Sequence, residues 1–339
     1  MGLWSYIARR LVLSVVVLFI VSIGTFSLVH AVPGDPIAGL LGERQADNPE
    51  VRKALEQRWG LDQPLPVQYK QYVSNLVQGD WGESISKRQP VGELLRIYVP
   101  ATGELAIAAM LFAIVVGVPL GIVAAIRQDG WADHLARFVA LLGTSMPVFW
   151  LGLLVSYVFF YELRWLPRQG RLDIGLDEPP LWTGVITIDA IKAGDWTALK
   201  SVLLHLIMPA CVLGSFAMGI IARMLRSSLV AAMSDDYVRT ARAKGLAEKK
   251  VVVGHALRNA LIPTVTVMGL TFASLLAGAV LTETIFDWPG IGRFAYETAI
   301  RRDYPGLLGV TLVVAVGYIV VNLFVDVLYG VLDPRIRVG

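Results

Sequence analysis

The sequence predicts an all-α integral membrane protein with six transmembrane helices. Of its 339 residues, 55% are hydrophobic and 17% are charged, and the mean hydropathy is +0.60. These values exceed those of an ordinary globular domain. A bilayer core about 30 Å thick needs roughly 20 apolar residues per helical crossing. Six apolar stretches meet that length: residues 11–32, 101–126, 138–161, 202–221, 264–286 and 305–330.

The first stretch follows Arg9 and Arg10, as the apolar part of a signal peptide would. Its apolar run is too long for a signal peptide, and the sequence His30-Ala31-Val32 lacks the small residues of a cleavage site. We therefore expect residues 1–32 to hold the N-terminus and transmembrane helix 1.

Residues 33–100 are predicted to form a helical extracytoplasmic segment between the first two spans. One helix would begin at the capping residue Asn48 and end at Gly60. A second would run from about Val67 and stop at Gly79, with one apolar face. The remaining residues, 101–339, hold the other five spans.

The distribution of positive charge predicts the orientation. The N-terminus and residues 127–137, 222–260 and 331–339 carry 14 Lys and Arg against 6 Asp and Glu, whereas the longer opposite loops carry 16 against 18. Short loops that are rich in Lys and Arg stay in the cytoplasm. Both termini and the loop 222–263 are therefore predicted to be cytoplasmic, and the net charge of +3 is a signal of topology and not of nucleic-acid binding.

The most informative segment lies within this loop, from Asp235 to Pro263. Asp235 and Asp236 favour the positive end of a helix dipole, and Gly245 permits a sharp change of direction. A second helix is expected over residues 247–259, and Pro263 suits the first turn of the next span. The physics alone leaves two interpretations open: a docking surface for a soluble partner, or an amphipathic element that binds anionic headgroups.

The segment resembles the cytoplasmic loop of ABC-importer permeases, whose pattern is Glu-Ala-Ala-x-x-x-Gly followed by Ile-x-Leu-Pro. The aligned residues here are Arg239-Thr240-Ala241, Gly245 and Ile262-Pro263. Arg239 replaces the leading Glu, and the closing Pro stands farther from the Gly; both departures resemble the peptide and nickel branch of the family. Further blocks similar to that branch are PGDP at 33–36, LLG at 40–42, GLDQPLPVQY at 60–69, GDWGES at 79–84, TETIFDWPGIG at 282–292, RDYP at 302–305 and DPRIR at 333–337.

This resemblance, which spans nearly the whole chain, is to the first permease subunit of dipeptide and oligopeptide importers. It implies a type I ABC importer transmembrane domain, in which residues 101–339 are the core permease domain. It also implies that the loop 222–263 docks an ATPase and passes its motion into the spans. The docking residues would be Asp236, Tyr237, Arg239, Thr240, Ala241, Lys244, Gly245, Leu246 and Pro263.

The implied partners are a second homologous permease in a heterodimer, two cytoplasmic ABC ATPases and an extracytoplasmic substrate-binding protein. The implied location is the bacterial cytoplasmic (inner) membrane. The chain has no phosphate-binding loop of the form GxxxxGK[ST], so we expect ATP and Mg²⁺ on the ATPases and no cofactor on this chain. We therefore expect a transport subunit and not an enzyme.

Candidate residues for the translocation path are Ser274, Gly278 and Glu283, which are small or ionisable and lie in the fifth span. Glu104 and Asp326 are the other ionisable residues near the spans, and pairing with Arg would explain them as well. His205, Met208 and Cys211 are three residues apart on one helix face, as a soft-metal site would be. Such residues are more often packing filler, and no metal site is predicted.

Three function classes remain distinct. An ATP-driven importer of peptides is favoured by the resemblance, although relatives with this layout also move nickel or glutathione. A secondary transporter driven by an ion gradient would be expected to show internal repeats and buried ionisable groups, and neither is clear here. An integral membrane enzyme would need a convergent catalytic set, and none is visible.

Overall fold

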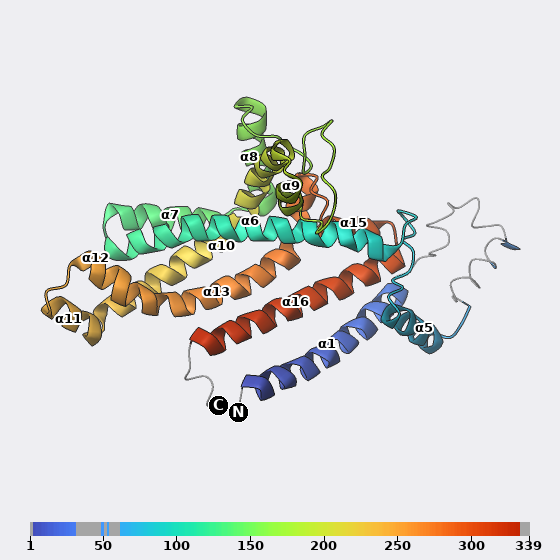
Figure 1. The fold of residues 1–339 in the computed structure, drawn as a ribbon, viewed down its shortest axis with the longest axis horizontal. Coiled ribbons are helices and arrows are strands. Elements are labelled where there is room, and N and C mark those ends of the chain that lie inside the picture. The colour runs from blue at the N-terminus through green and yellow to red at the C-terminus, as the bar shows by residue number, and fades with distance from the viewer. Residues whose placement is uncertain (1–2, 32–48, 51–52, 54–61, 333–339) are drawn as a thin grey trace.

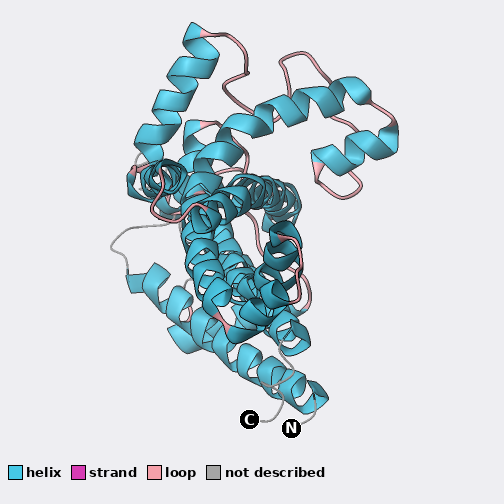
Figure 2. Ribbon diagram, turned by 90° about the vertical axis from the view of Figure 1, so that its left-hand side faces the viewer, coloured by secondary structure: helices cyan, strands magenta, loops and turns pink. Residues whose placement is uncertain are grey.

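The computed structural model describes all residues except 1–2, 32–48, 51–52, 54–61 and 333–339. Of the predicted helix from Asn48 to Gly60, only residues 49, 50 and 53 are described, and these are helical; the rest of that prediction lies outside the described residues. Within the described part, the regular elements are helices. Figure 2 shows them viewed along the bundle. The long ones are α1 (Leu3–Ala31), α6 (Val91–Ile126), α10 (Trp196–Ser234), α13 (Leu257–Gly278) and α16 (Tyr304–Leu332).

The shorter helices lie toward the ends of the bundle or where the chain changes direction between long helices. The bounds of these elements are α5 (Leu65–Val77), α7 (Trp131–Ser145), α8 (Val148–Ser156), η1 (Tyr157–Glu162), α9 (Ile186–Ala193), α11 (Asp236–Ala243), α12 (Glu248–Val251), η2 (Val252–Ala256), α14 (Val280–Ile285) and α15 (Ile291–Ile300). Helix α5 falls where the second helix of the outer segment was predicted. Elements α12, η2 and α13 follow one another without a gap, and η1 and η2 are π-helical turns.

Among the described residues, five helices are long and apolar enough to cross a membrane, or six if one bent pair counts as a single span. The bent pair is α7 with α8 and η1, which meet at 106°. We expected one continuous span over 138–161, and that expectation is wrong. Pro147 disfavours helical backbone at the preceding residue, and Met146 is extended, with φ −75° and ψ 132°.

Close contacts between backbones show the directions of the helices. A Cβ on Gly117 would meet Met218, and one on Gly121 would meet the carbonyl oxygen of Ala222 at 2.8 Å. Both residue numbers increase together, so α6 and α10 run parallel. Gly143 faces Ser215 and Gly219 faces Ala140, so α7 runs antiparallel to α10. The residues between α6 and α10 therefore carry the chain once from one end of the bundle to the other.

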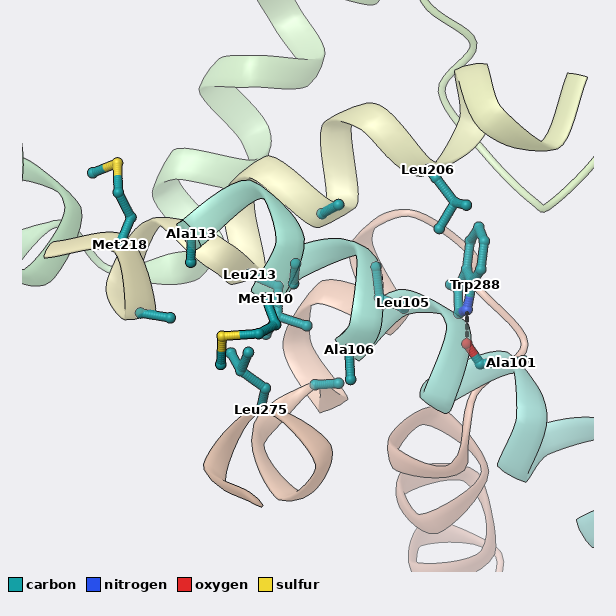
Figure 3. Packing of buried hydrophobic residues seen from close by; sticks show 14 of the residues in the cluster. Ala101, Leu105, Ala106, Met110, Ala113, Leu206, Leu213, Met218, Leu275 and Trp288 are labelled. Carbon is teal, nitrogen blue, oxygen red and sulfur yellow. Dashed lines mark hydrogen bonds between the residues drawn. The ribbon is translucent and has the colours of Figure 1, made fainter. Parts of the chain in front are cut away.

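Small residues make these approaches possible. Helices in lipid gain little from hydrophobic burial against each other and instead associate through close van der Waals packing of small residues. On α6, Ala101, Ala106, Ala109 and Ala113 are fully buried. They belong to one core cluster that also includes side chains of α10, α13 and Trp288. Figure 3 shows this cluster, in which the Trp288 Nε1 donates a hydrogen bond to the Ala101 carbonyl at 2.8 Å.

Helices α1 and α16 lie side by side at the edge of the bundle, as Figure 1 shows. The first residues of α1 and the last residues of α16 lie at the same end as α11. At the opposite end, α5 packs on both helices through Phe26, Tyr69 and Leu308. The Tyr69 hydroxyl and the Ser22 hydroxyl are 2.7 Å apart and hydrogen-bonded.

One buried carboxylate ties the outer segment to the last helix. Asp303, which is fully buried, caps α16 by accepting a hydrogen bond from the Gly306 N–H at 3.1 Å. It also accepts bonds from the N–H groups of Ile85 and Ser86, each at 3.0 Å, and from the hydroxyls of Ser84 and Ser86. The segment 84–86 is thereby held against the start of α16.

The glycine contacts predict that substitution lowers stability at a crowded glycine and not at an open one. A Cβ at Gly219 would lie 2.4 Å from the Ala140 carbonyl oxygen and 2.7 Å from the Thr144 methyl carbon. We expect Gly219→Leu to lower the free energy of unfolding by about 1–3 kcal/mol, because the helices must separate. Thermal unfolding of the purified chain in detergent measures this. The matched control is Gly103→Ala on α6, where a Cβ meets nothing within 4 Å; equal melting temperatures for both variants would contradict the packing account.

Candidate functional site

The predicted docking loop forms a short amphipathic helix, α11, at one end of the bundle (Figure 1). Val238 and Ala241 on its inner face are 0% and 6% exposed. They join a core cluster with the ends of α6 and α10 and with α12, η2 and α13. The opposite face carries Tyr237, Arg239 and Thr240, which are exposed. The apolar face of α11 is therefore packed against the bundle, and its polar face is exposed.

A turn at Gly245 ends this helix. The Gly245 N–H donates to the Arg242 carbonyl at 2.9 Å, and the Leu246 N–H donates to the Ala241 carbonyl at 3.4 Å. This pair of bonds is the Schellman motif, in which the residue after the cap adopts the left-handed region. Gly245 has φ +74°, and a Cβ there would meet nothing within 4 Å. The requirement for glycine is therefore one of backbone conformation and not of space.

An ion pair closes the turn. The Arg242 guanidinium donates to both carboxylate oxygens of Glu248 at 3.1 and 2.7 Å, which joins α11 to the start of α12. The hydrogen bond to Glu248 raises the pKa of Arg242. Both groups are exposed, so solvent screens their attraction and the pair adds little to stability. Its main effect is to fix the orientation of α11 relative to the start of α12.

The segment after the turn differs from the predicted helix pair. We expected a second helix over 247–259 and a new span opened by Pro263. Instead, α12, η2 and α13 continue as one helical run from Glu248 to Gly278, and Pro263 lies inside α13. The run contains a π-helical turn at Val252–Ala256, a local change of winding that is common at functional sites. Helix α11 is thus connected to a membrane span through the turn at Gly245 alone.

The structure brings most of the predicted docking residues together and separates others. Asp236, Tyr237, Arg239, Thr240, Lys244 and Gly245 are exposed on α11 and its turn. Ala241 and the half-buried Leu246 belong to the cluster beneath the helix. Pro263 is half-buried in α13 and away from the exposed face.

Of the three predicted path residues, Ser274 and Glu283 do not share one surface. Ser274 is exposed on α13, and its hydroxyl donates to the Leu270 carbonyl at 3.2 Å. Gly278 is the last residue of α13, and its surroundings lie outside the described residues. Glu283 is fully buried and accepts hydrogen bonds from the Thr102 hydroxyl at 2.6 Å and the Arg293 N–H at 2.8 Å. These contacts give Glu283 a structural role between α6, α14 and α15.

Sequence reasoning missed a polar network at the end of the bundle opposite α11. Arg171 pairs with Glu104, and both side chains are buried. Glu104 also accepts hydrogen bonds from the N–H and hydroxyl of Thr187, while the Arg171 guanidinium lies 5.5 Å from the Trp288 ring centroid. Arg pairing was one of the explanations considered for Glu104, but nothing in the sequence indicated a partner 67 residues away. The side chain of Asp326 lies outside the described residues.

A cleft of about 860 Å³ opens beside this network. Aromatic, basic and acidic side chains line it, including Trp81, Arg96, Arg171, Glu178 and Trp182. Nearby, Glu297 on α15 forms an ion pair with Lys87 at 2.7 Å. Partial burial raises the pKa of Glu297, but the hydrogen bonds and charges of Lys87 and Arg293 together outweigh it, so the pKa is lowered overall.

The described residues contain no group of three or more His, Cys, Asp or Glu side chains that could hold a metal ion. His205 is buried, its Nδ1 is hydrogen-bonded to the Ser201 carbonyl at 2.8 Å, and its Nε2 lies 4.0 Å from an Asp173 oxygen. Met208 packs in an apolar cluster with Val212 and Phe286.

Comparison with known proteins yields two family models that match this chain. The description "Binding-protein-dependent transport system inner membrane component" matches residues 117–338. The description "Binding-prot-dependent transport system membrane comp, N-term" matches residues 3–91. Together these matches cover residues 3–338 except 92–116, which belong to α6.

Curated relatives match nearly the whole chain. The dipeptide transport system permease protein DppB of Alkalihalophilus pseudofirmus is 46% identical over 333 residues, which is 98% of this chain and 99% of that protein. The di/tripeptide transport system permease protein DppB of Pseudomonas aeruginosa is 47% identical over 333 residues, 98% of each. The glutathione transport system permease protein GsiC of Escherichia coli is 40% identical over 333 residues, 98% of this chain and 99% of that protein. With these matches over a bundle of membrane helices, the chain belongs to the binding-protein-dependent transport system inner membrane components, multi-pass permeases of ABC transporters and not enzymes.

Proposed function

We propose that this chain is one permease subunit of an ATP-driven importer of di- or oligopeptides. The observation that carries the proposal is α11, whose apolar face is fixed in a core cluster while its polar face is open. A helix held in this way transmits a push from a soluble partner to the spans as a rigid body. The direct continuation of α12 into α13 provides one route for that motion.

The proposed partners follow from this arrangement and from the family. Two cytoplasmic ABC ATPases, which bind ATP and Mg²⁺, would dock on α11 and on the equivalent helix of a second, homologous permease. This chain itself would bind no cofactor. The second permease would complete a translocation path, to which the exposed Ser274 and the neighbouring Gly278 would contribute. An extracytoplasmic binding protein would deliver the substrate above the cleft near Arg96 and Trp182.

The proposed orientation places α11 and both termini in the cytoplasm. The ends of α1 and α16 lie on the same side of the bundle as α11, and the residues on that side are rich in Lys and Arg. The outer segment and the buried Arg171–Glu104 pair would then lie at the external end, where a binding protein arrives.

The proposed substrate rests on the relatives. Two relatives named for dipeptide or di/tripeptide transport are 46% and 47% identical to this chain, and the one named for glutathione transport is 40% identical. Peptides are therefore favoured over glutathione and over nickel. The family assignment does not favour a transporter driven by an ion gradient.

The turn at Gly245 provides a first test. A residue with a Cβ pays roughly 1–2 kcal/mol in left-handed backbone, so Gly245→Val should displace the end of α11 without any steric clash. We expect reduced co-purification of the ATPase subunits and a matching loss of ATP-dependent peptide uptake. Gly254→Ala is the control, because Gly254 lies in η2 and a Cβ there meets only Lys250 at 4.0 Å. Unchanged assembly and uptake for Gly245→Val would contradict the docking role.

Charge reversal on the open face provides a second test. The Arg239 side chain is 73% exposed, and its one ion pair is with the exposed Asp236. The double variant Arg239→Glu, Lys244→Glu should therefore fold normally but retain less ATPase. The loss of bound ATPase relative to the wild type should be smaller at high salt, because salt screens exposed charges. Pull-down of the ATPases at low and high ionic strength measures this effect. Lys192→Glu, at an exposed lysine of α9, serves as the control; if it loses as much ATPase as the double variant, the effect is not local to α11.

Competition for uptake tests the substrate class. The assembled importer, with its binding protein, should accumulate a labelled dipeptide in proteoliposomes only when ATP is supplied. Excess unlabelled dipeptide should suppress the signal, and excess glutathione or nickel should not. Accumulation without ATP under an imposed proton gradient would instead support the ion-driven alternative, and suppression by glutathione alone would reassign the substrate.

A further inference from the structure

A second cavity lies at the α11 end of the bundle, away from the docking face. It has a volume of about 290 Å³ and opens between the last turns of α6, the middle of α7 and the last third of α10. Its lining residues are Leu120, Ala124, Ala136, Arg137, Ala140, Leu141, Ala222, Arg223, Arg226 and Ser227. The proposed function uses none of these residues.

The floor of this groove consists of alanines. Ala124, Ala136, Ala140 and Ala222 are only 2–6% exposed, so their methyl groups form a shallow apolar surface between the three helices. Leu141, on the open side of α7, is 56% exposed. On helices that cross a membrane, an open apolar groove of this kind faces acyl chains and not water.

Three arginines line the groove, and a single carboxylate, that of Asp133, pairs with two of them. The fully buried Asp133 accepts bonds from Arg226 Nε and Nη2, each at 2.7 Å. Arg137 reaches the same carboxylate through Nε at 3.2 Å, and its side chain is 45% exposed. Among the described residues, Arg223 has no carboxylate partner; it donates only to the Thr144 hydroxyl at 3.3 Å. The nearest turn adds Arg127 and Asp129, which offset each other, so positive charge remains in excess.

The depth of these groups matches a headgroup region. Gly121 of α6 lies against Ala222, so Arg223 is about one helical turn, roughly 6 Å, inside the end of α6 at Ile126. Arginines near helix ends extend their charged groups toward the interface while their stems stay in the apolar layer. Basic pockets between membrane helices at this level bind the phosphates of anionic lipids.

We propose that the groove between α6, α7 and α10 is a binding site for an anionic phospholipid. The lipid phosphate would bind Arg223 and the remaining N–H donors of Arg137, whose Nε contacts Asp133 at 3.2 Å and whose Nη2 is hydrogen-bonded to His134 at 2.9 Å. Ser227 offers a further hydroxyl. The first acyl carbons would lie on the alanine floor and against Leu141. The Arg226–Asp133 pair fixes the groove by holding α10 to α7 and is not itself free to bind.

The combination of charge and apolar surface selects a lipid over other anions. A soluble phosphate would satisfy the arginines but leave the alanine floor in contact with lipid tails or water. A neutral phospholipid would cover the floor but would leave the excess positive charge of the groove without a compensating anion. An anionic phospholipid satisfies both requirements.

The test uses the full-length chain purified together with its partner subunits and stripped of lipid by detergent. Native mass spectrometry would measure the dissociation constants of phosphatidylglycerol and phosphatidylcholine, with inorganic phosphate as a competitor. We expect phosphatidylglycerol to bind more tightly than phosphatidylcholine. Binding should weaken roughly fivefold in Arg223→Gln and more in the double variant Arg137→Gln, Arg223→Gln, since each interfacial Arg contributes about that factor. Arg258→Gln, an exposed arginine on α13 outside the groove, is the matched control.

Each alternative has a distinct result. Equal binding of the two lipids, or unchanged binding in Arg223→Gln, would overturn the proposal. Complete displacement of the lipid by millimolar inorganic phosphate would make this a simple anion site. Binding by the isolated chain but not by the assembled transporter would show that a protein partner covers the groove. An equal loss in Arg258→Gln would show general surface attraction. None of these outcomes alters the docking prediction for α11.

Discussion

The fold depends on the close approach of three helix backbones. Helices α6, α7 and α10 meet where Gly117, Gly121, Gly143, Gly214 and Gly219 leave no room for a side chain. Inside a bilayer the surrounding tails are as apolar as leucine, so burial of large side chains does little to hold helices together. Short backbone distances and many small contacts replace that driving force. The parallel course of α6 and α10, with α7 antiparallel to both, follows from where these small residues fall.

The surface of α11 and the polar network near Glu104 both rest on contacts with these helices. The cluster beneath α11 includes Ala125 of α6 and Leu225 and Leu229 of α10, so the position of α11 is set by two of the closely packed helices. At the other end, Thr102 of α6 receives α14 and α15 through Glu283 and the Ile291 N–H. Helix α6 therefore contacts the elements at both ends of the bundle, the cluster under α11 at one end and α14 and α15 at the other.

Elements with a local signal could be predicted from the sequence. Apolar runs located the spans, and the turn at Gly245 could be predicted because left-handed backbone favours one residue type. The bend at Met146 was missed because the mean hydropathy of the span is insensitive to the single residue Pro147. Hydropathy also gives no information on the direction of a helix. The continuation of α12 into α13 was missed because Pro263 suits a helix start, yet its missing N–H is tolerated inside a membrane helix. The Arg171–Glu104 and Arg226–Asp133 pairs join distant segments, and nothing local to these residues indicates the partner.

The carboxylate of Asp303 has a consequence for how the protein is made. Synthesis proceeds from the N-terminus, so Ser84 and Ser86 emerge long before the residue that binds them, 219 and 217 positions later. Throughout the insertion of the intervening helices, the segment 84–86 has no anchor on α16. Its docking is therefore among the last steps of assembly. A truncated chain that stops before Asp303 would display this segment undocked, and quality-control proteases would have an accessible mark of an unfinished permease.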